Sequence, residues 1–187
     1  SYAWQQTGGP AVTLNSSTVA PPAFTAPATP TTLTFNLRVT DSRGQVAATA
    51  DSVTITVRDS AITNAALTSN SPTTLGQTTT LTATATGSNL TYLWNFGDGT
   101  PATPGGATIT HIFAGEGTFN PSVTIANGFD STTRNTPVNI TNVAPQANAG
   151  IDRNVLVGGT VTLNGAGSSD SDGHLPLGYS WLQTGGP

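Results

Sequence analysis

The sequence predicts an all-β protein built from sandwiches of antiparallel strands. Apolar residues alternate with polar residues through most regular stretches of the chain, and such alternation indicates strands with one buried face. Short clusters rich in Gly, Asp and Asn divide these stretches and indicate tight turns. No stretch has a convincing helical period. Short strands joined by glycine-rich turns are typical of β-sandwiches.

The alternation is clearest in five stretches, which are residues 33–40, 53–58, 80–86, 92–96 and 160–164. Each stretch places apolar side chains at every second position, so one face of the sheet is buried and the other lies in water. Thr dominates the polar positions and accounts for 36 of the 187 residues. Its branched side chain favours extended backbone, so we expect a strand at each stretch.

Turns are expected where these strands end. The motifs are Asp41–Gly44, Asp98–Gly99, Asn127–Gly128 and Asp172–Gly173, and Asp, Asn and Gly are the residues that tight turns favour. The segment 18–32 contains four prolines. Because proline cannot donate a ladder hydrogen bond, this segment is expected to be an edge or a connection rather than a central strand.

The composition excludes several classes of protein. The chain has no Cys, which rules out a disulfide framework, Cys-ligated zinc and a thiol nucleophile. Its five Arg residues are scattered, so no basic stripe for nucleic acid can form. No apolar run approaches the roughly 18 residues of a membrane-spanning helix. A weakly charged, hydroxyl-rich chain suits an extracellular or cell-surface component better than a metabolic enzyme.

An internal repeat organises the chain. Residues 1–10 read SYAWQQTGGP and residues 178–187 read GYSWLQTGGP, so seven of ten positions match at an offset of 177. A weaker echo, TYLWNFGDG, lies at residues 91–99. Two further matches join the middle of the chain to its ends: Gly76 and Leu81 match Gly158 and Leu163, and Thr34-Phe35-Asn36 with Val39-Thr40 matches Thr118-Phe119-Asn120 with Val123-Thr124 at an offset of 84.

These matches predict two related units. One unit is complete and spans residues 61–143. The other is split, with its N-terminal half at residues 144–187 and its C-terminal half at residues 1–60. Each half is expected to expose an apolar face and unpaired strand edges, which are liabilities in water.

Three explanations of the split remain open. The sequence is a window on a longer tandem-repeat chain, or separate subunits complete each other's domains head to tail, or the two halves close on each other within one chain. A head-to-tail contact between subunits makes an open filament.

The middle unit resembles a known family. Residues 94–100 read WNFGDGT, the His111-Ile112-Phe113 run follows, and Gly117-Thr118-Phe119 precedes Val123-Thr124. This pattern resembles the PKD domain, an Ig-like sandwich of the polycystic-kidney-disease type, although Asn95 stands where the family usually has Asp. The resemblance implies a non-catalytic extracellular spacer or adhesion module of about seven strands, often stabilised by calcium.

The split unit resembles the PKD/REJ-like domains of surface proteins. The residues that carry this resemblance are Gly158–Leu163, Gly167–Gly173, Tyr179-x-Trp181 and, in the other half, Phe24–Pro27. The resemblance implies arrays of such domains, and it identifies no ligand.

Asp170 and Asp172 are the best metal candidates, because two carboxylates on one tight loop can share a calcium ion. In an Ig-like sandwich the turn with Asp41 is expected at the same end as this loop, and Asp152 lies near the start of the domain. Asp41 and Asp170 are therefore expected to be neighbours only where two half-units meet. The loop is no EF-hand, since Trp181 stands where a bidentate Glu is needed. A plain polar turn is the alternative.

Four aromatic residues are expected to support the fold. Trp4, Trp94 and Trp181 share one strand position in the repeats, which is typical of core packing. Exposed coplanar rings would instead favour sugar binding. The resemblance gives His111 a structural role. No acid–base pair or nucleophile constellation can be assembled, so the sequence predicts no enzyme.

Asn15, Asn89 and Asn139 fit the N-glycosylation pattern, although such triplets arise often in a chain rich in Thr and Asn.

The sequence as a whole favours a structural repeat unit of an extracellular fibre, filament, stalk or adhesin. Its expected partners are adjacent copies of itself, its expected ion is Ca²⁺, and its expected location is the cell surface. The alternative is a polysaccharide- or protein-binding accessory module of a secreted or surface protein, including a secreted hydrolase.

Overall fold

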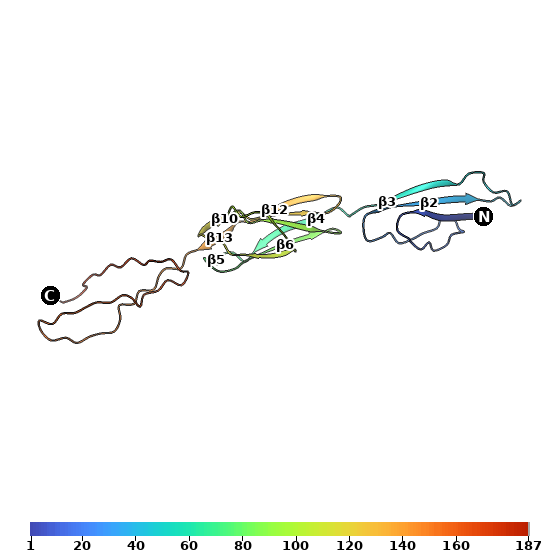
Figure 1. Cartoon of the computed structure of the whole chain (residues 1–187). Coiled ribbons are helices and arrows are strands. Elements are labelled where there is room, and N and C mark those ends of the chain that lie inside the picture. The colour runs from blue at the N-terminus through green and yellow to red at the C-terminus, as the bar shows by residue number, and fades with distance from the viewer. Residues whose placement is uncertain (187) are drawn as a thin grey trace.

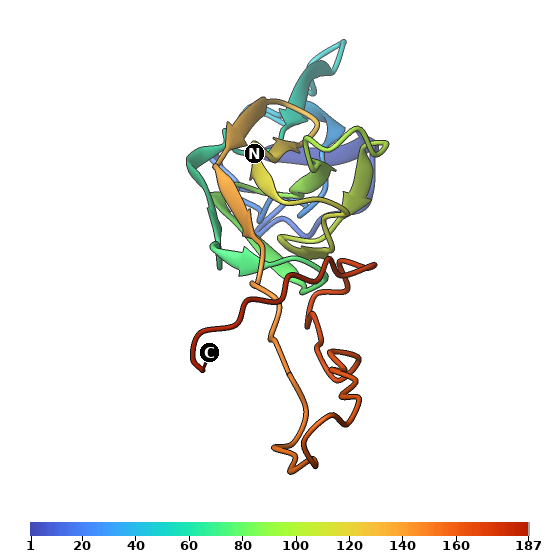
Figure 2. The same cartoon turned by 90° about the vertical axis from the view of Figure 1, so that its left-hand side faces the viewer.

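Three regions follow one another in an elongated line (Figure 1). The computed structural model describes residues 1–186, and within them it contains thirteen strands and no helix. Figure 2, turned by 90°, looks along the line from the C-terminal side. The N-terminal region and the C-terminal region lie at opposite ends, with the middle sandwich between them. The two halves therefore do not close on each other within one copy.

The N-terminal region is a three-stranded antiparallel sheet. Its strands are β1 (Tyr2–Gly8), β2 (Thr31–Val39) and β3 (Asp51–Val57), in the order β1-β2-β3. Trp4 lies opposite Leu37, and Phe35 lies opposite Val53. Because side chains alternate along a strand, these apolar residues share one face while Thr and other polar residues line the opposite face. Only Leu33 and Phe35 are buried among the apolar residues of this sheet.

The middle sandwich contains the remaining ten strands. They are β4 (Thr63–Ser69), β5 (Thr73–Thr74), β6 (Thr79–Thr86), β7 (Thr91–Asn95), β8 (Thr103–Gly105), β9 (Thr108–His111), β10 (Gly117–Phe119), β11 (Ser122–Ala126), β12 (Ser131–Asn135) and β13 (Val138–Thr141). They pair in the orders β4-β6-β9, β12-β11-β7-β8 and β10-β13-β5. All of these pairs are antiparallel except β13 with β5, which is parallel.

A closed core holds the middle sandwich together. Trp94 on β7 is 0% exposed, and its indole Nε1 donates to the carbonyl of Gly106 at 3.0 Å. The buried apolar residues around it come from all three sheets and the adjoining loops: Leu67, Leu81, Ala83, Phe96, Phe113, Val123, Ile125, Val138 and Ile140. The alternation of residues 80–86 and 92–96 thus becomes two facing strands with one shared interior.

The C-terminal region has a different character. Residues 144–186 form no strand, and their isolated bridge joins Gln146 to Ser169. The strand expected at residues 160–164 is absent, because the chain brings no partner beside it: the matching strand β6 pairs with both β4 and β9. Large apolar side chains of this region remain exposed: Ile151, Val155, Leu156, Val157, Val161, Leu163, Leu175, Tyr179, Trp181 and Leu182.

None of the described residues forms a helix that is long and apolar enough to cross a membrane.

Candidate metal site and domain junctions

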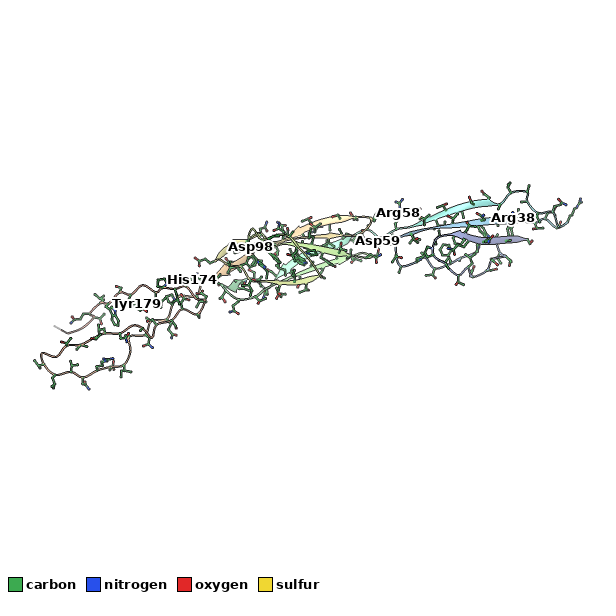
Figure 3. All side chains as sticks on the ribbon, viewed as in Figure 1. Arg38, Arg58, Asp59, Asp98, His174 and Tyr179 are labelled. Atoms are coloured by element: carbon green, nitrogen blue, oxygen red, sulfur yellow. The ribbon has the colours of Figure 1, made fainter. Side chains whose placement is uncertain are left out.

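A buried carboxylate closes the junction between the N-terminal region and the middle sandwich. Asp59 accepts hydrogen bonds from Ser88 Oγ at 2.8 Å, Asn89 Nδ2 at 2.6 Å and the Gly128 N–H at 3.1 Å. The hydrogen bond from Asn89 is the main cause that lowers the pKa of Asp59, against the opposing effect of burial. Figure 3 labels Asp59 at this junction. No sequence motif marks this residue.

Asn127 completes the same junction. Its Oδ1 accepts from the N–H groups of Phe129 and Asp130, at 3.0 and 2.8 Å, which fixes the turn between β11 and β12. Its Nδ2 donates to two carbonyl oxygens, those of Ser60 at 2.9 Å and Ser88 at 3.0 Å. One amide therefore ties the incoming chain to two loops of the sandwich.

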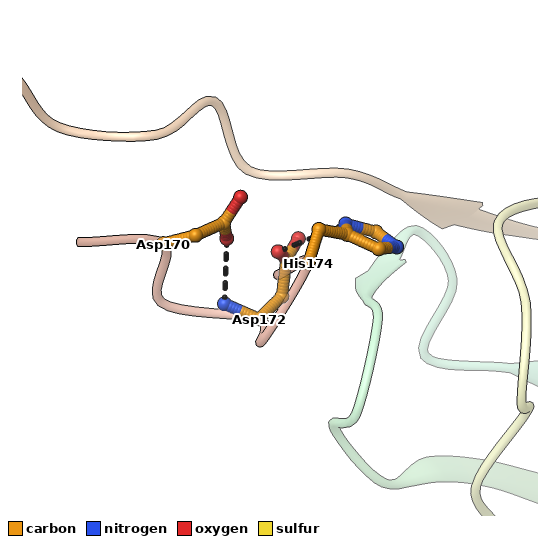
Figure 4. Close-up of side chains that lie close together, drawn as sticks. All are labelled: Asp170, Asp172 and His174. Carbon is orange, nitrogen blue, oxygen red and sulfur yellow. Dashed lines mark hydrogen bonds and ion pairs between the residues drawn. The ribbon is translucent and has the colours of Figure 1, made fainter. Parts of the chain in front are cut away.

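A second junction joins the middle sandwich to the C-terminal region. Asp172 Oδ2 accepts from the Val143 N–H at 2.6 Å. Asp170 Oδ1 accepts from the Asp172 N–H at 3.1 Å (Figure 4). The Asp172 side chain is only 2% exposed, and its Oδ1 accepts no hydrogen bond from the described residues. His174 Nδ1 lies 3.3 Å from that oxygen. The interaction of the Asp172 carboxyl with the Asp170 side chain, followed by the hydrogen bond from the Val143 N–H, lowers the pKa of Asp172.

These three side chains can hold a cation. One ligand atom each from Asp170, Asp172 and His174 lies within 4.8 Å of the others. Calcium takes six to eight oxygen ligands, carboxylates and carbonyls among them. The two carboxylates suit calcium, whereas the exposed His174 ring does not add an oxygen. Among the described residues of one copy, the cluster supplies only part of a calcium shell.

The other two metal candidates lie away from the cluster. Asp41 lies on the turn between β2 and β3 in the N-terminal region, where its Oδ1 accepts from the N–H groups of Arg43 and Gln45 at 2.8 Å each. The cluster contains neither Asp41 nor Asp152. Asp152 borders a hollow of about 590 Å³ in the C-terminal region. One copy thus brings Asp170 and Asp172 together, without Asp41 or Asp152.

Asp98 and His111 form an ion-pair geometry inside the middle sandwich. His111 Nε2 lies 2.6 Å from Asp98 Oδ2, and the His111 ring stacks on Phe96 with centroids 3.8 Å apart. Burial raises the pKa of Asp98, but hydrogen bonds from Thr100 and His111 outweigh it and lower the pKa to about 2. The Asp98–Gly99 turn therefore anchors His111, a contact that the sequence motif alone did not indicate.

The three tryptophans have three different surroundings. Trp94 is fully buried, while Trp4 is half-buried and donates from Nε1 to the carbonyl of Val19 at 3.2 Å. Trp181 is 49% exposed, in contrast to the core position expected for it, because residues 144–186 alone provide no opposing sheet.

The three glycosylation candidates also differ in their surroundings. Asn139 is exposed on β13, and Asn15 is exposed with Oδ1 accepting from the Ala23 N–H at 2.8 Å. Asn89 Nδ2, the atom that would carry a glycan, already donates to Asp59 and to the Ala28 carbonyl. A glycan at Asn89 is incompatible with these two contacts.

Two family models match parts of this chain. Residues 64–140 match the family model of the PKD domain, and residues 1–57 match that of the K319L-like PKD domain. A comparison with curated proteins finds no match.

Two solved structures share a limited likeness. The amphioxus IgVJ-C2 molecule has 14% identity and a TM-score of 0.46, covering 74% of this chain and 88% of that one. The D00-D0 domain of Intimin has 14% identity and a TM-score of 0.32, covering 75% and 84%. The two family matches and the all-β structure show that the chain contains PKD-type Ig-like domains, at residues 1–57 and 64–140, a non-catalytic kind of module usual in extracellular and surface proteins.

Proposed function

We propose that this chain is a structural repeat unit of an extracellular fibre, filament, stalk or adhesin. Its two terminal regions are halves of one PKD-type sandwich, and an adjacent repeat or second copy completes each half. The observation that carries this proposal is the contrast in burial: the middle sandwich has ten buried core residues, whereas every large apolar side chain named above for residues 144–186 is exposed. Exposed apolar surface of this extent favours association.

The middle sandwich supplies the template for the completed unit. In it, β6 pairs with β9, and the Leu81 of β6 faces Trp94 in the same core. The repeat matches Leu163 to Leu81, and Trp4 and Trp181 to Trp94. A completed unit would place residues 160–164 over the apolar face of the N-terminal sheet, as β6 lies over β7.

The N-terminal sheet offers a matching surface. An open hollow of about 240 Å³ lies on its apolar face. The residues around it are Trp4, Leu14, Pro21, Pro22, Phe24, Phe35, Val53 and Ile55. Val53 and Ile55 remain 41% and 37% exposed, although they alternate with Thr as buried residues do. Apolar side chains such as Val161 and Leu163 suit this surface, because their burial stabilises the contact by roughly 1.5–3 kcal/mol each.

Sedimentation velocity tests the proposal. The chain is expected to form head-to-tail oligomers whose size rises with concentration, and Val161→Asp is expected to abolish them because it buries an unpaired charge. Leu93→Asp is the matched control, since Leu93 is an exposed apolar residue of the middle sandwich. A monomer at all concentrations, or equal loss in both variants, would contradict the proposal.

The buried Asp172 carboxylate supports a second proposal, that calcium stiffens the junction before the split unit. Asp172 Oδ1 accepts no hydrogen bond from the described residues, and Asp170 lies beside it. Asp41 occupies the turn position that Asn127 holds in the middle sandwich, and each side chain accepts two backbone N–H bonds of its own turn through Oδ1. The Asn127 amide donates to two carbonyl oxygens, which the Asp41 carboxylate cannot do. A cation could instead bridge the Asp41 carboxylate and carbonyl oxygens at this position.

In this proposal Asp170 and Asp172 come from one copy and Asp41 from the copy that completes the unit, with Asp152 near the domain start. Calorimetric titration of assembled chain with CaCl₂ tests it. Asp172→Asn is expected to weaken binding strongly, and the exposed Asp51→Asn to leave it unchanged. Equal binding by both variants would contradict the site.

Half-exposed rings favour polysaccharide binding as the competing function. Tyr179 is 57% and Trp181 49% exposed in one copy. A fluorescence titration with soluble polysaccharide distinguishes the two functions. The structural proposal expects no response from assembled chain, because Trp181 is then buried in the completed unit as Trp94 is buried in the middle sandwich. A saturable response of the assembled chain would favour the binding module.

A further inference from the structure

We propose that residues 178–186 of one copy replace β1 on the edge of β2 in a second copy. The inference rests on the proposed function and names the strand that makes the contact. Its starting point is that the chain carries this sequence twice, once as β1 beside β2 and once in the C-terminal region, where the described residues form no strand.

The two versions agree at the positions of β1 that share the face of Trp4. Tyr2, Trp4 and Gln6 lie opposite Val39, Leu37 and Phe35 in the β1–β2 ladder. The corresponding residues Tyr179, Trp181 and Gln183 are identical in type.

The three mismatches all fall on the other face. They are Ser1 against Gly178, Ala3 against Ser180, and Gln5 against Leu182. Ser1, Ala3 and Gln5 are exposed, so their substitution changes nothing that β2 contacts from the core side. A second version of the strand that keeps the face of Trp4 retains the ability to pair with β2, even where its other face varies.

The end of the strand is also preserved in conformation. Gly9 has a φ of 83° and Gly186 a φ of 87°. A Cβ at Gly9 would overlap the Thr32 carbonyl oxygen and the Leu33 side chain, so the seat on β2 requires glycine there. Gln6 Nε2 donates to the Gly8 carbonyl at 3.1 Å, and Gln183 Nε2 donates to the Gly185 carbonyl at 2.9 Å. Residues 178–186 therefore already hold the shape of β1 where it leaves the sheet.

Replacement of β1 by residues 178–186 also brings additional apolar surface into contact with the N-terminal sheet. β1 is held in its own copy by the Trp4 N–H to the Ser17 carbonyl at 2.9 Å and by the Trp4 indole to Val19. Its replacement can make the same contacts, so the exchange of the strands themselves is nearly neutral. Trp181 also packs near Gly165 and borders the hollow that contains Val161 and Leu163. Seating it on β2 brings this apolar surface onto the N-terminal sheet.

Disulfide trapping in the full chain tests the exchange, because the chain has no cysteine of its own. Gln5 lies directly opposite Asn36, and Cα atoms of opposed strand residues lie about 4.5–5.5 Å apart, within reach of a disulfide. Chains with Leu182→Cys are mixed with chains with Asn36→Cys under mild oxidation. A crosslink between the two chains, identified by peptide mass mapping, is the expected result.

Three controls sharpen the test. Gln5→Cys with Asn36→Cys in one chain reports that the geometry permits a disulfide. Leu182→Cys mixed with Ser52→Cys is expected to give no crosslink, since Ser52 lies one strand further from the edge. Locking β1 with an Ala3→Cys/Arg38→Cys disulfide, another opposed pair, is expected to abolish the Leu182–Asn36 crosslink.

The outcomes separate the two proposals. If copies associate in sedimentation but Leu182→Cys fails to link to Asn36→Cys, strand replacement is wrong and completion of the sandwich by other strands stands. If the copies neither associate nor crosslink while the internal Gln5–Asn36 disulfide forms, both proposals are overturned.

Discussion

Trp94 and Trp181 occupy the same place in the repeated strand pattern, yet one is fully buried and the other is half exposed. Around Trp94, β6 and β9 form the opposing sheet that closes the core. Around Trp181, the matching residues 160–164 pair with nothing in the described chain. The comparison teaches that an alternating sequence decides which face of a strand is apolar, whereas burial requires the opposing strands to be present.

Replacement of each tryptophan by alanine is expected to have very different effects on the middle sandwich. Trp94→Ala is expected to destabilise the middle sandwich by about 3–5 kcal/mol, because a large buried ring leaves a cavity. Trp181→Ala should leave the unfolding midpoint of the middle sandwich unchanged in dilute, unassembled chain. Urea unfolding of both variants measures the difference. Equal losses would show that Trp181 supports the middle sandwich, contrary to the structure.

Two glycines of the N-terminal region differ in the same way, since one lies against the neighbouring strand and the other lies in open space. Gly9 and Gly44 both have positive φ, 83° and 84°, but a Cβ at Gly44 meets nothing within 4 Å. Gly44→Ala is expected to cost about 1–2 kcal/mol through backbone strain alone. Gly9→Ala should cost more, because its Cβ overlaps the Thr32 carbonyl and loosens β1. Hydrogen exchange of the β2 amides checks this; equal protection in both variants would mean that β1 does not depend on the close approach at Gly9.

The Asp98–His111 contact should make the middle sandwich sensitive to acid. The folded pKa of Asp98 is about 2, below the ordinary value of 3.8. A depressed carboxyl pKa stabilises the fold above the unfolded pKa, and this contribution is lost as the pH falls from about 4 towards 2. Asp98→Asn is expected to reduce stability at pH 7 by up to about 2 kcal/mol.

The pH dependence provides the check on that prediction. Thermal unfolding at pH 7 and pH 2 should show the gap between wild type and Asp98→Asn shrinking at low pH. Asp51→Asn, at the exposed start of β3, is the matched control. A gap that stays constant with pH would mean that the loss comes from packing and not from the charge.

Much of the fold follows from the sequence pattern, and the failures are informative. The all-β class and the facing strands at 80–86 and 92–96 follow from period-two alternation. The strand expected at 160–164 does not form, since alternation carries no information on whether a partner is present. The repeat in the sequence matches Val39 to Val123. The ladders instead make Leu37 the counterpart of Val123, because Leu37 lies opposite Trp4 and Val123 lies opposite Trp94.

Among the site residues, those that are close in sequence could be predicted and those that the fold brings together could not. Asp170 and Asp172 are two positions apart on one turn, so local spacing was enough to bring them together. Asp59 escaped notice because its partners Ser88, Asn89 and Gly128 come from distant loops. The signal that could have found it is its position just before the first strand of the complete unit. Such contacts depend on strand order, which composition and periodicity do not contain.

The distance between the Asp41 turn and the Asp170 loop tests the central claim most directly. Spin labels at Arg43→Cys in one copy and Ser171→Cys in another report it in the assembled state. Labels at Phe129→Cys and Thr86→Cys in one chain provide the reference, because they mark the corresponding turn and loop of the closed middle sandwich. The expected result is an intermolecular distance comparable to that reference. Association with no such short distance between copies would contradict it.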